Sequence, residues 1–247
     1  MRYKEIKPEG LLSHFIQCFW EYEVIDDERD HTIVPDGYFD LIAIFEDNVL
    51  SSVMLTGVWT KPINIFIPKS TKYYAIRFKL LAAEYLFSHE IKTILDKRKQ
   101  LPLDFWDINE YKTDEFERFV VDISCKLENS IVQLSAIDER KLKLFDAIYK
   151  KDSQSVAVLS SKVCWSSRQI NRYFNSQFGF SLKEFLKIIR CQSSYKDIAR
   201  GESFPQIDYY DQAHFIKEVK KYTGSTPTEL FKNKNDRFLQ LSTIKQG

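Results

Sequence analysis

Apolar and polar residues in the first third of the chain follow the spacing of β-strands. Residues 33–45, IVPDGYFDLIAIF, contain a Pro-Asp-Gly turn and then an apolar run rich in aromatic and branched side chains, which predicts a turn entering a strand. Residues 63–67, INIFI, alternate as a half-buried strand does. Residues 72–78, KYYAIRF, predict another strand, and the short connection between these two runs predicts a hairpin that pairs them.

From residue 81 onward the apolar spacing becomes helical. Residues 81–90 predict a helix, and so do residues 113–129, in which the apolar side chains fall on one face. This second helix should therefore bury a single apolar stripe. The stripe consists of Phe116, Phe119, Val120, Ile123 and Leu127.

After a boundary at residues 129–136 the pattern is helical throughout. Residues 138–151 begin with Asp138, a good N-cap. Residues 153–165 predict a short helix, and residues 182–200 predict a longer one with a basic face. The change of pattern predicts two domains and a tail, at residues 1–132, 133–235 and 236–247.

The helical half contains an internal repeat with a period of 45 residues. Each copy is a helix of about three turns that opens with an N-cap residue, carries apolar residues at i and i+4, and ends near a glycine suited to the left-handed conformation. A new helix starts just beyond the glycine. Two copies of such a unit are more informative than one. Equivalent positions are Ser166 and Asp211, Ile170 and Phe215, Arg172 and Lys217, Phe174 and Val219, Gly179 and Gly224, and Glu184 and Glu229.

The face of each repeat opposite the apolar residues is polar and mostly basic. In the first copy Arg168, Arg172 and Asn175 point outward together, and the two arginines lie one helical turn apart, so that both can enter one groove. Arginine forks match N7 and O6 of guanine as well as phosphate oxygens. The short helix at residues 153–165, a sharp turn and the arginine-bearing helix together make a helix-turn-helix. In the second copy the outward face holds Ala213, Lys217 and Lys220.

The stretches SRQINRYFNSQFGFSLKEFLKIIR and DQAHFIKEVKKYTGSTP resemble the DNA-binding domain of the AraC/XylS family of transcription regulators, and the second is close to the family's C-terminal signature. The resemblance covers residues 155–231, about a third of the chain. It implies two helix-turn-helix units, joined by a long helix, that insert recognition helices into successive major grooves. By this resemblance the base-reading candidates are Arg168, Asn171 and Arg172 in the first unit, and Gln212, His214 and Lys217 in the second.

The N-terminal stretches VPDGYFDLIAIF, GVWTKP and YYAIRFK are similar to the sensor-like domain that precedes this DNA-binding domain in a bacterial subgroup, and such domains are often cupin-like barrels. One departure from the family concerns the second unit. Residues 200–209, where its supporting helix should lie, contain Gly201 and Pro205 and no helical stripe, and Asp208 stands where a glycine is typical. We therefore expect an abbreviated second unit that mainly contacts phosphates through Lys217 and Lys220.

Composition adds a charge asymmetry. Residues 151–247 hold 16 Lys and Arg against 9 Asp and Glu, a net charge of +7, whereas residues 1–150 hold 20 against 26, a net charge of −6. A basic C-terminal segment that follows an acidic N-terminal segment favours a second domain that binds a polyanion.

No apolar run approaches the roughly 18 residues of a membrane span and no secretory signal is visible, so we expect a cytoplasmic protein without membrane contact. The cysteines are far apart, as reduced and mostly buried thiols are: Cys18, Cys125, Cys164 and Cys191.

Candidate catalytic and metal-binding residues are few. His214 has no nucleophile and acid in a recognisable order around it, so we expect no enzyme. His14, His31 and His89 are isolated, and we expect neither a metal nor a cofactor. Three aromatic residues beside the strands either line a ligand pocket or, more commonly for such residues, belong to the core: Tyr38, Phe39 and Trp59.

The sequence thus predicts an α+β N-terminal domain, in one version a cupin-like barrel, followed by an all-α helix-turn-helix domain. The function that fits best is a sequence-specific DNA-binding transcription regulator. It would read double-stranded DNA with the helix at residues 166–178 and with the abbreviated unit at residues 211–223. A small-molecule effector, RNA polymerase and a second copy of the chain are further partners that this function allows. The alternative is a protein-interaction module that uses the same basic helices without binding DNA.

Overall fold

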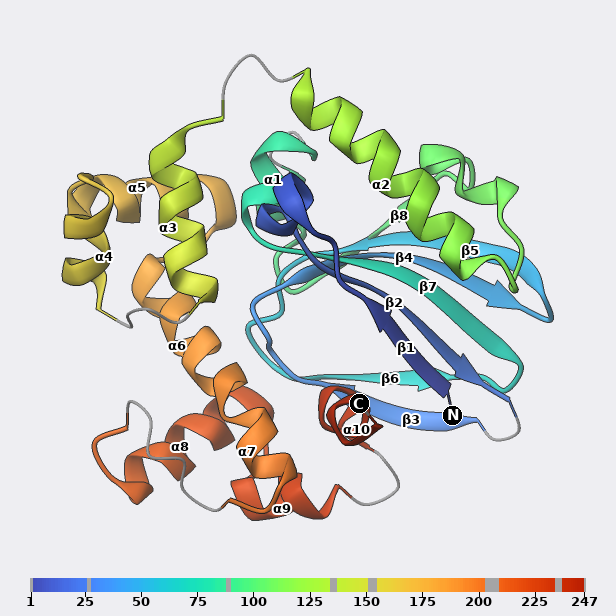
Figure 1. Cartoon of the computed structure of the whole chain (residues 1–247). Coiled ribbons are helices and arrows are strands. Elements are labelled where there is room, and N and C mark those ends of the chain that lie inside the picture. The colour runs from blue at the N-terminus through green and yellow to red at the C-terminus, as the bar shows by residue number, and fades with distance from the viewer. Residues whose placement is uncertain are drawn as a thin grey trace.

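The computed structural model describes residues 2–25, 28–87, 90–133, 137–150, 155–202, 209–233 and 237–246 (Figure 1). Strands dominate the N-terminal part and helices the C-terminal part. The helix α2 (Phe116–Val132) belongs to the strand-rich part, and α3 (Glu139–Tyr149) opens the helical part. Asp138 caps α3 as predicted, since its side chain accepts a hydrogen bond from the backbone N–H of Arg140.

The described strands form two antiparallel sheets. The larger sheet is open, because β1 and β8 are its two edges and do not pair with each other, and it takes the place of the closed barrel that the family resemblance allowed. Its order is β1 (Arg2–Ile6), β2 (Ile16–Val24), β7 (Thr71–Phe78), β4 (Phe39–Glu46), β5 (Val49–Thr56) and β8 (Arg98–Leu101), and the smaller sheet pairs β3 (Arg29–Ile33) with β6 (Ile63–Ile67).

The predicted hairpin of residues 63–67 and 72–78 is wrong. Both runs are strands, but β6 pairs with β3 in the small sheet, and β7 pairs with β2 and β4 at the centre of the large one. The burial of the strands explains the difference. Tyr74, Ala75 and Ile76 of β7 are completely buried, which requires cover on both faces of the strand, whereas β6 exposes Asn64 and Phe66 and needs cover on only one.

The helix α2 lies across the large sheet and buries the predicted apolar stripe, all five residues of which are inaccessible to solvent or nearly so (Figure 1). Phe119 of this stripe meets Phe19 of β2 edge to face, with ring centroids 6.3 Å apart. The helix predicted at residues 81–90 is limited to its first turn, and residues 88 and 89 lie outside the described part of the chain. The remaining short elements are η1 (Gly10–His14), α1 (Leu81–Tyr85), η2 (Glu90–Ile94) and η3 (Phe105–Glu110).

The linking helix predicted over residues 182–200 is interrupted near its C-terminal end. Ser194 donates its hydroxyl to the carbonyl of Cys191 (2.7 Å), and its backbone N–H bonds the same carbonyl (3.1 Å), so a tighter turn separates α6 from α7. The segment predicted as a tail is a helix, α10. The helices after α3 are α4 (Val156–Lys162), α5 (Ser167–Phe178), α6 (Leu182–Ser193), α7 (Tyr195–Ala199), α8 (Gln212–Thr223), α9 (Pro227–Lys232) and α10 (Leu239–Gln246).

The two domains share one hydrophobic core. Phe39 of β4 and Phe185 of α6 belong to the same cluster of buried side chains, which runs without interruption from the large sheet to the helices. Gly37 lies at this junction with φ +82°, and a Cβ at this position would be only 2.5 Å from Cδ1 of Ile189. The hydroxyl of Tyr149 accepts a hydrogen bond from the backbone N–H of Leu80 and donates one to the carbonyl of Gly37, both at 2.9 Å. The helical part is therefore packed firmly on the sheets.

Candidate nucleic-acid interface

The first helix-turn-helix consists of α4, a tight turn and α5. Cys164 in the turn adopts a left-handed conformation with φ +51°, and α5 then begins at a capping box. In this box the hydroxyl of Ser166 accepts from the backbone N–H of Gln169 (3.3 Å), and the side chain of Gln169 accepts from the backbone N–H of Ser166 (3.0 Å). These local bonds fix where α5 begins and therefore which residues it presents to solvent.

The predicted repeat is confirmed by its caps. Asp211 opens α8 by accepting from the backbone N–H of His214 (2.7 Å), and α5 and α8 end at Gly179 (φ +81°) and Gly224 (φ +74°). The helix that follows each glycine begins with a capping box of the same kind, Ser181 with Glu184 and Thr226 with Glu229. The pairing of Glu184 with Glu229 in the sequence thus reflects an equivalent structural role. The buried positions agree as well, since Ile170, Phe174, Phe215 and Val219 are all completely inaccessible.

Four basic side chains are available on the outer faces of the two helices. Arg168 and Arg172 of α5 and Lys217 and Lys220 of α8 are exposed, and none of them makes a hydrogen bond or an ion pair with another described residue. Unpaired cations on two equivalent helices are what a phosphate backbone would neutralise.

Two predicted contact residues on α5 have internal roles. Asn171 is half-buried; its side-chain oxygen accepts from the backbone N–H of Leu182 (3.2 Å) and its amide donates to the carbonyl of Ser167 (3.0 Å). Both ends of this amide are thus engaged in holding the start of α6 against α5. Asn175 donates to the carbonyl of Asn171 (2.9 Å) but is exposed, and within the described residues its side-chain oxygen accepts no hydrogen bond.

The candidates at the start of α8 differ in their surroundings. Gln212 is exposed and its side chain bonds to no described residue. His214 has its Nε2 atom 3.5 Å from Oε2 of Glu218 and its ring edge against Tyr209, with a side chain that is 44% exposed. A carboxylate and a phenol surround the imidazole, and no nucleophile lies beside it in the described residues, so the geometry offers a polar contact rather than a general base.

An ion pair that the sequence did not reveal orients the second unit. Arg190 of α6 and Glu218 of α8 form a bidentate pair, with N–O distances of 2.6 Å and 2.9 Å, and the Glu218 side chain is only 7% exposed. The Arg190 guanidinium also lies over the ring of Tyr209, 5.0 Å from its centroid. Residues 203–208, in which Pro205 and Asp208 pointed to an abbreviated unit, lie outside the described part of the chain. The bonds between Arg190 and Glu218 attach α8 directly to the linking helix α6.

The aromatic candidates of the N-terminal domain separate into core and cavity. Phe39 is completely buried, and Tyr38 stacks on Tyr149 with centroids 5.2 Å apart, whereas Trp59 lines a cavity between the two sheets.

Cys191 is completely buried, and burial raises its pKa to about 12, so its thiol is not a reactive group. Cys18 is buried too, but Cys125 and Cys164 are exposed, so only half of the thiols are buried as predicted.

No group of three metal-ligating side chains comes together among the residues that the structure describes. In the same part of the chain, none of the helices combines the length and the apolar character needed to cross a membrane.

Solved structures with a similar arrangement include the ToxT protein of Vibrio cholerae. An apo form of a ToxT variant shares 15% identity with this chain, covers 86% of it and 97% of its own length, and superposes with a TM-score of 0.45. ToxT bound to an unsaturated fatty acid shares 14% identity over 86% of this chain and 93% of its own, with a TM-score of 0.40. Likeness at this level is too low to indicate a shared ligand. No curated protein sequence matches the chain significantly.

Two families match separate parts of the chain. Residues 4–100 match a family described as a domain of unknown function, which corresponds to the strand-rich part. Residues 159–233 match a family described as a helix-turn-helix domain, and this range runs from α4 to α9 and holds both repeats. The match points to a regulator of transcription and not to an enzyme. The chain therefore carries a helix-turn-helix domain of the AraC type behind a separate N-terminal domain.

Proposed function

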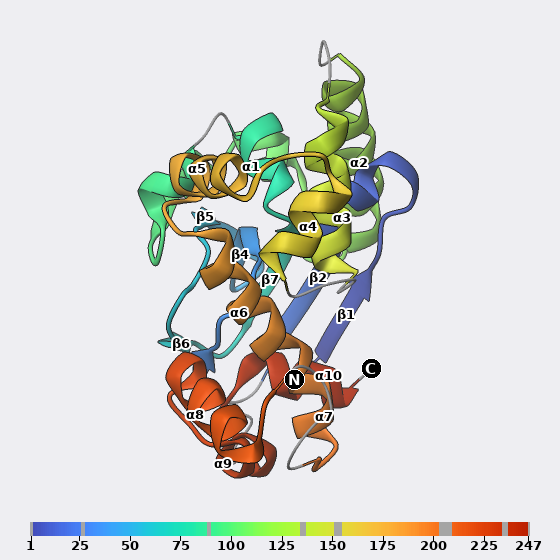
Figure 2. The ribbon, with the colours of Figure 1, turned by 90° about the vertical axis from the view of Figure 1, so that its left-hand side faces the viewer.

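We propose that this protein regulates transcription by binding promoter DNA sequence-specifically, with α5 as the base-reading helix and α8 as a helix that mainly holds phosphates. The observation that carries the proposal is the repetition of one capped helix with unpaired outer cations. The two copies lie near the two ends of α6, which sets their spacing (Figure 2). Two recognition helices at a fixed spacing suit successive major grooves on one side of a duplex.

The chemistry of the exposed side chains distinguishes the two helices. Arg168 and Arg172 present planar forks one turn apart, and such forks can recognise guanine with two hydrogen bonds. Lys217 and Lys220 are flexible point charges, which suit phosphates and carry little sequence information. Asn175, Gln212 and His214 are exposed beside these cations and would add polar contacts to the same duplex. Asn171 would act by positioning α6 against α5, because both ends of its amide are already bonded.

The test compares the DNA upstream of the protein's own gene with a shuffled duplex by fluorescence anisotropy over a series of salt concentrations. Arg172→Ala should weaken binding to the native duplex by about 1–3 kcal/mol and relax the preference at one base pair. Lys217→Ala should weaken both duplexes alike and reduce the slope of log K against log salt by about one unit. Arg200→Ala is the matched control, since Arg200 is also exposed but lies outside both recognition helices. Equal losses on both duplexes for Arg172→Ala would contradict base reading by α5.

The remaining partners follow from this function. A cavity in the N-terminal domain supports a small-molecule effector. A protein that binds promoter DNA would act in the cytoplasm. One base-reading helix covers few base pairs, so we infer that two copies bind a two-fold operator and contact RNA polymerase from there. The rival function is a protein-interaction module. It would bind its partner with little salt dependence and would leave duplex DNA unbound at low salt.

A further inference from the structure

A cavity of about 80 Å³ lies between the two sheets of the N-terminal domain and beneath α10. Its volume is about half that of a 150 Å³ cavity known to hold benzene, so it has room for a ligand of only a few heavy atoms. Side chains from β2, β4 and β7 form one wall, and Leu239 and Gln240 of α10 form part of another. A ligand here would therefore touch both the sensor-like domain and the C-terminal helix.

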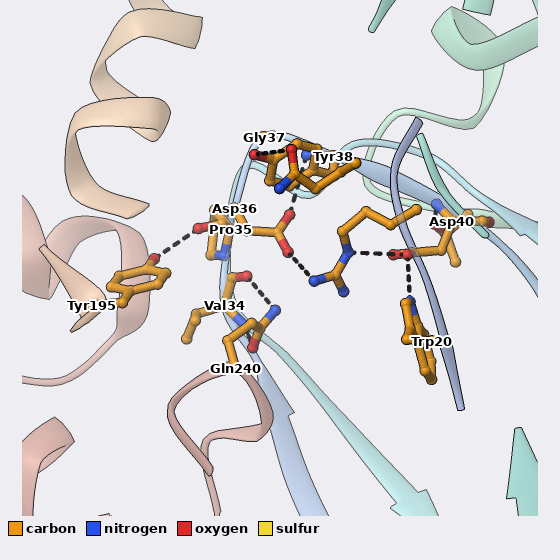
Figure 3. A network of polar contacts seen from close by, with 12 residues as sticks. Trp20, Val34, Pro35, Asp36, Gly37, Tyr38, Asp40, Tyr195 and Gln240 are labelled. Atoms are coloured by element: carbon orange, nitrogen blue, oxygen red, sulfur yellow. Dashed lines mark hydrogen bonds and ion pairs between the residues drawn. The ribbon is translucent and has the colours of Figure 1, made fainter. Parts of the chain in front are cut away.

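The charged residues that line this cavity carry one excess negative charge. They are Asp36, Asp40 and Arg77, two carboxylates against one guanidinium. The guanidinium of Arg77 contacts both aspartates, which are labelled in Figure 3: its Nε donates to Oδ1 of Asp40 (3.1 Å), and its Nη1 lies 3.7 Å from Oδ2 of Asp36. The second distance is too long for a hydrogen bond. One cation shared in this way cannot neutralise both carboxylates.

The two carboxylate oxygens of Asp40 differ in their hydrogen bonds. Its Oδ1 accepts from both the indole N–H of Trp20 and Nε of Arg77, each at 3.1 Å. Its Oδ2 accepts no hydrogen bond from any described residue, and it is not completely buried. An acceptor of this kind, next to an uncompensated charge, suits a ligand that donates hydrogen bonds and carries a positive charge.

The walls of the cavity favour the same charge. The rings of Trp20, Tyr22, Trp59 and Tyr73 line it, and the faces of aromatic rings attract cations and repel anions. Arg77 already uses this property, since its guanidinium lies 5.9 Å from the ring centroid of Trp20. An anionic ligand would raise the excess negative charge of the site to two, with no further cation in the lining to offset it.

The helix α10 connects this cavity to the second helix-turn-helix unit. The side-chain amide of Gln240 bonds the backbone of Val34 in both directions, accepting from its N–H (3.1 Å) and donating to its carbonyl (2.8 Å) (Figure 3). Leu239 reaches the cavity, while its neighbours Phe238 and Leu241 belong to the buried cluster that contains Phe215 of α8. A shift of α10 at the cavity would therefore move side chains that share a buried cluster with Phe215 of α8.

We propose that this cavity binds a small primary alkylammonium ion, and that its occupancy is transmitted through α10 to the DNA-binding face of α8. The ammonium group would donate to Oδ2 of Asp40 and neutralise the excess charge of the three ionic residues. Its short alkyl chain would lie against the aromatic walls and Leu239. The ligand site stands independently of the proposed function, whereas the transmission to α8 rests on it.

Calorimetric titration of the full chain with three probes of matched size tests the ligand class. The probes are n-propylamine, 1-propanol and propionate at pH 7.5, where the amine is protonated. We expect saturable binding of n-propylamine and binding at least about tenfold weaker for the other two, because the charged hydrogen bond is lost. Asp40→Asn should weaken n-propylamine to the level of 1-propanol, and Asp114→Asn, an exposed carboxylate remote from the lining, should leave it unchanged. Equal binding of the three probes by the unaltered chain, preference for propionate, or no binding of any probe would overturn the proposal.

Fluorescence anisotropy with the native duplex, with and without saturating n-propylamine, tests the transmission. A change in DNA affinity of threefold or more that disappears in Asp40→Asn would support it. Binding of the amine with unchanged DNA affinity would overturn the transmission through α10. If the chain bound no DNA under any condition, the proposed function would fail, while the calorimetric result would still decide the ligand site.

Discussion

At the scale of single residues, buried ionic groups distinguish this protein most clearly from a generic helix-turn-helix protein. Asp36 is the clearest case. Burial raises its pKa from the ordinary 3.8 to about 6, an effect that the nearby Arg77 only partly offsets and that Asp40 reinforces. Arg190 and Glu218, by contrast, satisfy each other with a bidentate bond. The buried Asp36 lowers the stability of the fold and gives the cavity a charged wall. The Arg190–Glu218 pair holds the recognition helix α8 in place.

Asp36 should make the stability of the protein depend on pH. The folded state binds the proton of the Asp36 carboxyl more tightly than the unfolded chain does. The protonated carboxyl therefore stabilises the fold fully below pH 3.8, and this stabilisation is lost as pH rises through 6. Asp36→Asn resembles the protonated acid and should therefore raise the free energy of unfolding at pH 7.5 by up to about 3 kcal/mol, with little effect at pH 3.5. Urea unfolding of both proteins at the two pH values measures this. The expectation fails if the variant is no more stable than the natural chain at pH 7.5.

At the scale of elements, the caps set the helix boundaries on which the interface depends. Ser181 and Thr226 are equivalent residues of the repeat, and each closes a capping box with a glutamate three positions on. Ser181→Ala and Thr226→Ala should each lower the free energy of unfolding by about 1 kcal/mol, because a backbone N–H loses its partner. Ser176→Ala is the control, since Ser176 is exposed within α5 and its side chain bonds to no described residue; it should change stability by less than about 0.5 kcal/mol. Chemical denaturation of the three variants measures these changes. The interpretation is contradicted if Ser176→Ala lowers the free energy of unfolding as much as the two cap variants do.

The same local signals explain how far the sequence could predict the structure. Caps, glycine ends and apolar stripes depend on residues a few positions apart, so α2, α3 and the repeat could be predicted from spacing alone. The partner of β6 could not, because pairing with β3 depends on contacts some 30 residues away along the chain. The Asp36, Arg77 and Asp40 cluster joins β4, β7 and the loop before β4, and Arg190 meets Glu218 across two helices. No periodic pattern marks such pairs, and a lone arginine in a strand or a glutamate in a basic helix looks like ordinary surface charge.

At the scale of the whole molecule, the N-terminal domain holds both recognition helices at equivalent points. Gly179 at the end of α5 lies near Leu95 and Lys92, and Gly224 at the end of α8 lies near Pro62, so that a Cβ at either glycine would touch the N-terminal domain at 3.5 Å. The exposed cations lie on the outer faces of the same helices, away from these contacts. The sensor-like domain can therefore influence the position of each recognition helix without covering the residues proposed to meet DNA.

This packing predicts that the two domains unfold together. The buried cluster runs from Phe39 and Phe78 in the sheet to Phe145 and Phe185 in the helices, so separating the domains would expose apolar surface on both. Tyr149→Phe removes the hydroxyl that bonds Leu80 and Gly37 across the junction and leaves a buried donor and a buried acceptor without partners, at a cost of about 1–3 kcal/mol. Hydrogen exchange followed by mass spectrometry should show an equal loss of protection in peptides from β7 and from α6. Tyr210→Phe is the matched control, because Tyr210 is 95% exposed and should leave both peptides unchanged. Loss of protection in only one of the two peptides would mean that the domains open independently, and that a signal in the cavity reaches the DNA-binding helices through α10 alone.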